Sequence, residues 1–209
     1  MASDLKSENR KHIYWLLALP VLLSAAIQTK TSSISDEWLS LVAIEGTSGA
    51  LLYAAALLLT NLLPSNIKHK LVFTKVTNEM PAGRAHQLVS IDPRIDINTA
   101  AEKWPHVFNE NTSEAQRNSL WYKHIYKHVR DTPPVQQAHR LFLLFRDVTS
   151  GSAFLLIASL IWLAIGLLGT LPKLHPIIPF VLLTYTALTL IVARNAGNRI
   201  VVNAIAEAL

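Results

Sequence analysis

The sequence predicts an α-helical multi-pass membrane protein in which four transmembrane helices form two hairpins, joined by a small, mainly α-helical cytoplasmic domain. Three observations predict this fold class: four apolar runs, a polar segment of 84 residues between the second and third runs (64–147), and a very uneven distribution of Lys and Arg. Hydrophobic residues make up 51% of the 209 residues and charged residues 16%, which is apolar-rich for a soluble domain of this length.

Each apolar run is close to the length of a membrane-spanning helix. A hydrocarbon core about 30 Å thick requires about 20 helical residues, with a range of roughly 17 to 25. The runs contain 15, 25, 19 and 17 residues and are Ile13–Ile27, Leu39–Leu63, Ala153–Leu171 and Ile177–Ala193. The short first run, with its basic flank, also fits a cleaved signal peptide. A retained helix is the favoured interpretation, because Tyr14 and Trp15 suit the aromatic belt of a membrane surface.

These runs divide the chain into three segments. Residues 1–63 hold an N-terminal arm and the first hairpin, with spans at about 13–28 and 39–63. Residues 64–147 form the cytoplasmic domain. Residues 148–209 hold the second hairpin, with spans at about 150–171 and 177–194, and an amphipathic tail helix after Gly197.

The basic residues orient these segments. Of the 19 Lys and Arg residues, 17 lie in the N-terminal arm, the central segment and the C-terminal tail, and only Lys30 and Lys173 lie in the two short connectors between spans. By the positive-inside rule, both termini and the central segment are cytoplasmic and the connectors face outward. The predicted location is the inner (cytoplasmic) membrane of a bacterium, and the lipid bilayer is the first expected partner.

The second run carries the one acidic side chain that lies inside a predicted span, Glu45. An ionisable residue at that depth marks a functional site by default. We therefore expect Glu45, with Ser48 and Gly49, to line a pore or ion path. The alternative is that this carboxylate reaches the water at the headgroups, since a run of 25 residues can tilt or protrude.

Small residues form a stripe on the same helix. Gly46, Ala50 and Ala54 repeat every four residues and therefore share a face. Small side chains allow helices to approach closely, so this stripe is expected to be a helix-packing interface. Its partner is either another span of the same chain or a second copy.

In the cytoplasmic segment, the first elements are expected to form a small sheet or to be helical. Residues 70–77 are rich in β-branched side chains and are interpreted as a strand, with 86–91 as its partner. Asn98 is expected to cap a short helix that ends before Pro105.

Two longer helices are expected in the rest of this segment. The first begins at Thr112 or Ser113 and ends at residues 131–134, where an Asp and two Pro residues follow. The second begins near Val135 and continues directly into the third span. At the membrane border, Arg146 and Asp147 are expected to form an ion pair.

The densest local pattern is the ten-residue sequence WYKHIYKHVR at 121–130. Like residues recur four positions apart, which on one helix produces three adjacent stripes: Tyr122 and Tyr126, Lys123 and Lys127, and His124 and His128. With Arg130, the two lysines are candidate phosphate ligands, and either tyrosine is a candidate stacking partner for a base. The alternative is a basic solvated or lipid-facing helix with Trp121, Ile125 and Val129 packed inward.

Metal binding and catalysis are less favoured. Although His124 and His128 have a spacing that can hold zinc, the metalloprotease motif requires Glu where this chain has Ile125. The spacing specifies no third ligand, for which the candidates are His106, Asp131 and His139. The chain contains no cysteine, no Gly-rich phosphate loop and no nucleophile elbow. We expect no cofactor and no enzyme activity.

The layout of two membrane hairpins around a compact cytosolic module resembles the small multi-span membrane proteins that act as effectors or sensors in bacterial anti-phage systems. This resemblance covers the layout of the whole chain, and it implies a homo-oligomeric channel or membrane-disrupting effector controlled by a nucleotide, nucleic acid or protein cue. The small-residue stripe and Glu45 independently favour an oligomeric channel, gated through the basic cytoplasmic domain. The alternative is a membrane-anchored sensor or scaffold that binds such a cue at the cytoplasmic face.

Overall fold

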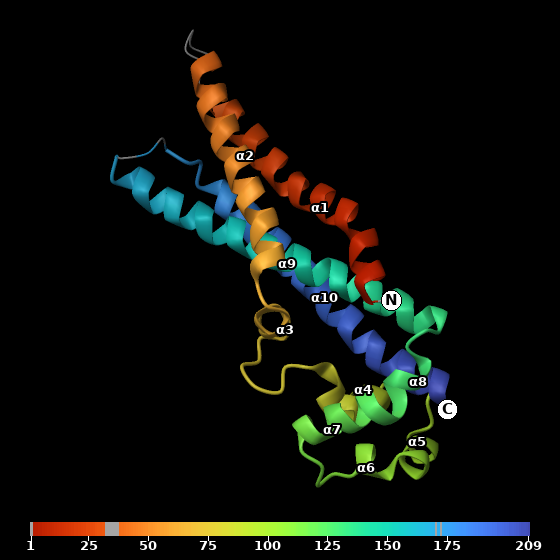
Figure 1. The fold of residues 1–209 in the computed structure, drawn as a ribbon. Helices are drawn as coiled ribbons and strands as arrows, with labels where there is room; N and C mark the ends of the chain where they lie inside the picture. The colour runs from red at the N-terminus through yellow and green to blue at the C-terminus, as the bar shows by residue number, and fades with distance from the viewer. Residues whose placement is uncertain (1, 32–37, 170, 172) are drawn as a thin grey trace. The chain divides into compact units, whose positions relative to one another are not determined.

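A computed structural model describes residues 2–31, 38–169, 171 and 173–209, and the side chains of residues 2–7, 29–31 and 38–48 are outside this description. Within these ranges the chain is helical and has no strand (Figure 1). The helices are α1 (Ala2–Thr31), α2 (Trp38–Leu62), α3 (Ser65–Phe73), η1 (Pro81–Arg84), α4 (Ala85–Val89), α5 (Ile97–Lys103), α6 (Pro105–Phe108), α7 (Glu114–Trp121), η2 (Tyr122–Tyr126), α8 (Lys127–Val129), α9 (Pro133–Leu167) and α10 (Ile177–Ala208). The expectation of a helical protein is therefore confirmed.

Three of these helices are long enough and apolar enough to cross a membrane. The qualifying segments among the described residues are Glu8–Gln28, Pro133–Leu167 and Ile177–Ala208. They contain the first and fourth apolar runs of the sequence and most of the third. Such helices indicate that the protein associates with a membrane.

The chain divides into two compact units. Unit 1 comprises Met1–Pro64 and Leu144–Leu190, and unit 2 comprises Ser65–Leu143 and Ile191–Leu209. The helices α9 and α10 each have residues in both units and are continuous over 35 and 32 residues. The expected helix that continues without a break from Val135 into the third apolar run is thus confirmed.

Unit 1 is held together by two apolar clusters. In the first, Leu17 of α1 is completely buried and packs with Leu144 and Val148 of α9. The second joins Ala56 of α2 to α9 and to Leu182 of α10. Many large side chains outside these clusters are exposed, as expected for helices that face lipid.

Two tyrosine hydroxyls form hydrogen bonds between helices of unit 1. The Tyr185 hydroxyl donates to the Leu16 carbonyl at 2.6 Å, and the Tyr53 hydroxyl donates to the Tyr14 carbonyl at 2.9 Å. The first bond joins α10 to α1, and the second joins the consecutive helices α1 and α2. A hydrogen bond between apolar spans satisfies groups that lipid cannot.

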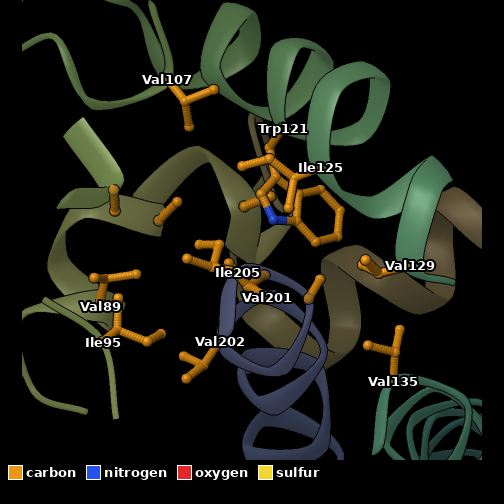
Figure 2. Close-up of a cluster of buried hydrophobic side chains, with 14 residues drawn as sticks. Val89, Ile95, Val107, Trp121, Ile125, Val129, Val135, Val201, Val202 and Ile205 are labelled. Carbon is orange, nitrogen blue, oxygen red and sulfur yellow. The ribbon is translucent and has the colours of Figure 1, made fainter. Parts of the chain in front are cut away.

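Unit 2 has its own core, which is built from α4 to α9 and the C-terminal end of α10 (Figure 2). Val201 and Ile205 of α10 are completely buried beside Ile125 and Trp121. The tail expected after Gly197 therefore forms part of α10 and packs into the core of unit 2.

The prediction of two strands at 70–77 and 86–91 is wrong. Residues 65–73 form α3 and residues 85–89 form α4, with Val72 and Val89 buried in the interior. Packing of β-branched residues against helices overrides their strand propensity here. An isolated pair of strands would also have been only marginally stable.

Local capping explains where several helices begin. The Asp96 side chain, rather than that of Asn98, caps α5 by accepting from the N–H groups of Asn98 and Thr99. Ser113 caps α7 and forms a capping box with Gln116, as the predicted start near Thr112 or Ser113 requires.

The two prolines expected to close the preceding helix instead begin the next one. α8 ends at Val129, and Pro133 and Pro134 occupy the first turn of α9. Proline is tolerated there because the N–H groups of the first turn have no partner within the helix.

Gly151 allows α1, α2 and α9 to approach one another within unit 1. A Cβ atom at this position would lie 2.7 Å from Leu17 Cδ1 and 3.1 Å from Thr60 Cγ2. Both neighbours are buried, so they have little space into which to move.

We predict that Gly151→Ala destabilises the protein by about 1–3 kcal/mol, because the added methyl group overpacks this contact. The measurement is thermal unfolding of purified protein in detergent. Gly49→Ala is the matched control, since its Cβ would lie an ordinary 4.0 Å from Val21 Cγ1. Equal unfolding midpoints for the two variants would contradict the close-approach interpretation.

Candidate functional site

The repeated motif at 121–130 lies in unit 2 and contains a π-helical turn. Residues Tyr122–Tyr126 form η2, between α7 and α8. In a π-helix each hydrogen bond reaches five residues back, so residues four apart no longer lie directly above one another as in an α-helix. The stripes expected from α-helical spacing are therefore distorted in this segment. Such turns occur frequently at functional sites.

Aromatic rings gather around Tyr126. Its ring stacks on Trp121 at a centroid distance of 5.1 Å and on Tyr122 at 5.5 Å. Its hydroxyl shares a hydrogen bond of 2.9 Å with His139 Nδ1 on α9. Burial raises the pKa of the Tyr126 phenol, so this group remains neutral at physiological pH.

Tyr122 is the exposed member of this group, with 52% of its surface accessible. Of the two tyrosines predicted as stacking partners for a base, Tyr122 is therefore accessible, whereas Tyr126 packs against the core of unit 2. Because its ring stacks on Tyr126, Tyr122 is positioned at little further cost in side-chain entropy.

The basic side chains of the motif are exposed, as Tyr122 is. Lys123 and Lys127 are both exposed, and Arg130 Nε lies 3.5 Å from a carboxylate oxygen of Asp131. Both members of that pair are about half exposed, so the pair contributes little to stability. The arrangement offers cations for phosphate and one aromatic face for a base.

The two histidines of the motif lie on the exposed surface of unit 2. His124 and His128 are exposed, and among the described residues no group of three His, Cys, Asp or Glu side chains lies close enough together to hold a metal ion. Of the three candidates for a third ligand, His139 is instead bonded to Tyr126, and Asp131 is paired with Arg130.

Arg117 is a buried arginine of unit 2 that sequence reasoning missed. Its side chain is only 3% exposed and donates to the carbonyls of Val107, Gly83 and Asn109 at 2.8, 2.9 and 2.8 Å. These bonds connect α7 to η1 and to the C-terminal end of α6. In a basic polar segment, nothing in the sequence distinguishes a buried arginine from the exposed ones.

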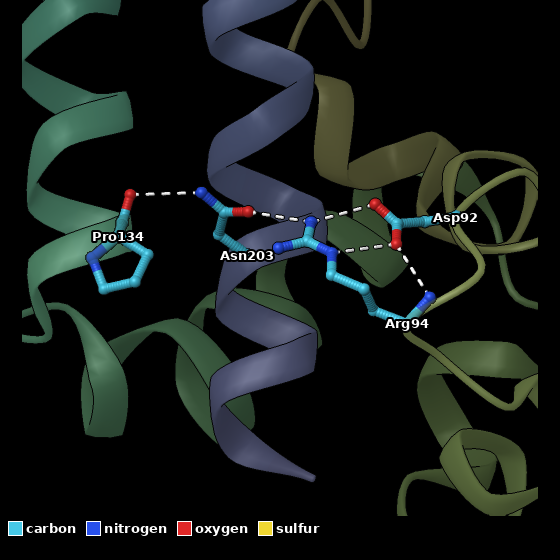
Figure 3. Close-up of polar contacts among 4 residues, drawn as sticks. All are labelled: Asp92, Arg94, Pro134 and Asn203. Atoms are coloured by element: carbon cyan, nitrogen blue, oxygen red, sulfur yellow. Dashed lines mark hydrogen bonds and ion pairs between the residues drawn. The ribbon is translucent and has the colours of Figure 1, made fainter.

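A second polar network connects the loop before α5 to two long helices (Figure 3). Arg94 binds both carboxylate oxygens of Asp92 at 2.9 Å and donates to the Asn203 side-chain carbonyl at 3.0 Å. The Asn203 amide in turn donates to the Pro134 carbonyl at 3.1 Å. The hydrogen bonds from Arg94 lower the pKa of the Asp92 carboxyl, which keeps it charged.

Unit 1 contains a buried polar layer on α9, which we define as Arg146, Asp147, Thr149, Ser150 and Ser152. Arg146 and Asp147 form the expected ion pair at 3.0 Å, and both are buried. The hydroxyls of Ser150 and Ser152 donate to carbonyls one turn back. The Thr149 hydroxyl is buried and has no hydrogen-bond partner in the part of the chain that the structure describes. Polar groups at the end of an apolar span are costly and are typical of functional positions.

No protein-family model, curated protein or solved structure matches this chain. Its functional interpretation therefore rests on the chemistry of these residues.

The residues predicted on α2 are only partly described. The side chains of Glu45, Gly46 and Ser48 lie outside the described residues. Ala50 and Ala54 are exposed, and the face of α2 that packs within unit 1 carries other residues, including Ala56 and Thr60. Gly49 is partly buried near Val21 of α1.

Proposed function

We propose that this chain is a four-span protein of the bacterial inner membrane whose unit 2 binds an anionic cue at the cytoplasmic face and thereby gates an ion path formed by several copies. The fourth span is α2, whose 25 residues would extend about 37 Å. One observation supports this proposal best. The exposed basic and aromatic residues lie in unit 2 and the apolar clusters of Leu17 with Val148 and of Ala56 with Leu182 lie in unit 1, and the helices α9 and α10 continue from one unit into the other. The layout resemblance to anti-phage effectors suggests a role in antiviral defence.

Recognition is assigned to the surface around Tyr122. Lys123, Lys127 and Arg130 supply charges that phosphate groups prefer, and Tyr122 supplies the aromatic face. A nucleotide or a single-stranded nucleic acid combines phosphate with a base and matches both features. A protein cue with a phosphorylated or acidic segment would use the charges alone.

Assembly is assigned to the small-residue face of α2. Ala50 and Ala54 are exposed in the single chain, so a second copy can approach them closely. Several copies arranged around this face would bring the Glu45 positions together as a ring of carboxylates. Such rings are a common means of attracting cations into a channel.

The alternative function is a membrane-anchored sensor or scaffold without an ion path. One observation favours it: the polar layer of α9 is closely packed, with Asp147 2% and Thr149 0% exposed. These residues offer no open passage through one copy. In that case the same cue would bind unit 2 and recruit a partner.

We predict that Lys123→Ala with Lys127→Ala weakens binding of fluorescent ATP and of a labelled single-stranded oligonucleotide at least about tenfold, because two phosphate contacts are lost. Fluorescence anisotropy of purified protein is the measurement. The matched control removes two other exposed charges of unit 2, by Lys70→Ala with Arg199→Ala. If both double variants bind as tightly as the parent, or lose affinity equally, the assignment of this surface is wrong.

The ion path has its own test in proteoliposomes. With the binding probe present, we predict cation flux, and Glu45→Gln should reduce cation over anion selectivity because it removes the negative charge from the path. Membrane-potential dyes under a salt gradient give the readout. Absence of flux in the parent protein, with probe binding intact, would favour the sensor or scaffold; flux with unchanged selectivity in Glu45→Gln would remove the role of that residue.

A further inference from the structure

A cavity of about 420 Å³ lies in unit 1 at the connector between α9 and α10. Leu163 and Leu167 of α9 form one side, and Leu174 and Pro176 of the connector form another. Gly166 also lines it. The volume falls within the range of small-molecule sites.

The polar part of the cavity is shaped by Gln28 at the end of the first candidate span. Its side-chain amide donates to the Lys173 carbonyl at 2.9 Å and accepts from the His175 N–H at 3.0 Å. Both ends of the amide thus hold the backbone of the connector. Lys173 and His175 both line the cavity.

These two side chains present hydrogen-bond donors. His175 Nδ1 accepts from the Ile177 N–H at 3.2 Å, so the neutral ring carries its proton on Nε2. Lys173 adds an ammonium group, and none of the described residues that line the cavity is acidic. One end of the cavity therefore suits an anion, while the leucines suit a hydrocarbon chain.

We propose that this cavity binds one anionic phospholipid of the outer leaflet, with its phosphate at Lys173 and His175 and part of an acyl chain along Leu163 and Leu167. The inference rests on the proposed function in two respects, namely that α9 and α10 span the membrane and that the connector between them faces outward. A connector between two spans lies at headgroup level, where a lysine contacts lipid phosphates. Leu167 and Leu168 are 78% and 80% exposed, so the apolar wall continues to the lipid-facing surface.

Native mass spectrometry of the full chain in detergent, with equal amounts of phosphatidylglycerol and phosphatidylcholine, tests this proposal. The parent protein should retain one phosphatidylglycerol with a preference of about fivefold or more over phosphatidylcholine. Lys173→Ala should remove the preference, and Leu163→Trp should lower retention of both lipids because it fills the cavity. Lys11→Ala is the control, since it removes one exposed charge from the N-terminal arm and should leave the preference unchanged.

Two results would overturn the proposal: a parent protein without the preference, or a Lys173→Ala protein that keeps it. Displacement of the lipid by millimolar inorganic phosphate would make a soluble anion the occupant and would overturn the lipid assignment as well. Carbonate extraction of membranes tests separately whether the chain is integrated in the membrane, and so distinguishes a wrong lipid site from wrong spans. A chain released by carbonate contradicts both, whereas a retained chain without lipid preference contradicts only the lipid site.

Discussion

The burial of the C-terminal end of α10 is the constraint on which the organisation of unit 2 depends. Val201 and Ile205 are completely buried and contact a core drawn from helices more than 60 residues earlier in the chain. Two polar side chains of the same helix reinforce this packing: Asn203 is bonded to Pro134 and Arg94, and Arg194 donates to the Val72 carbonyl at 2.5 Å. Gly197 lets α10 approach Phe73, because a Cβ there would lie 2.7 Å from that ring. Without this helix, the short helices around it would lack an apolar partner.

This constraint gives the proposed function a physical basis. α10 supplies Ile178 and Leu182 to a cluster in unit 1 and supplies Val201 and Ile205 to the core of unit 2. α9 is shared in the same way, and it carries both the buried polar layer and His139, the hydrogen-bond partner of Tyr126. A ligand that reorders the rings around Tyr126 would therefore act on a residue of a helix that continues into the candidate span. In an equilibrium between two arrangements, such a ligand shifts populations by its difference in affinity for them.

Features set by local chemistry could be predicted from the sequence, whereas features set by distant contacts could not. The apolar runs in α1, α9 and α10 follow from length and composition, and the Ser113 capping box follows from residues three apart. The strand at 70–77 was wrong because packing decided the conformation of Val72. The burial of Arg117 and the π-helical turn could not be predicted from the sequence, because each depends on residues brought together by folding. The role of Glu45 stays a prediction.

The central claim is that one chain presents unit 2 on the inner side of a membrane and the connector at Leu171 on the outer side. Because the chain has no cysteine, single cysteines introduced at Asn111 and at Leu171, both exposed, can be labelled without background. In intact spheroplasts, a membrane-impermeant maleimide should label Leu171→Cys, and it should label Asn111→Cys only after the membrane is permeabilised. Labelling of both positions from outside, or of neither before permeabilisation, would contradict the account.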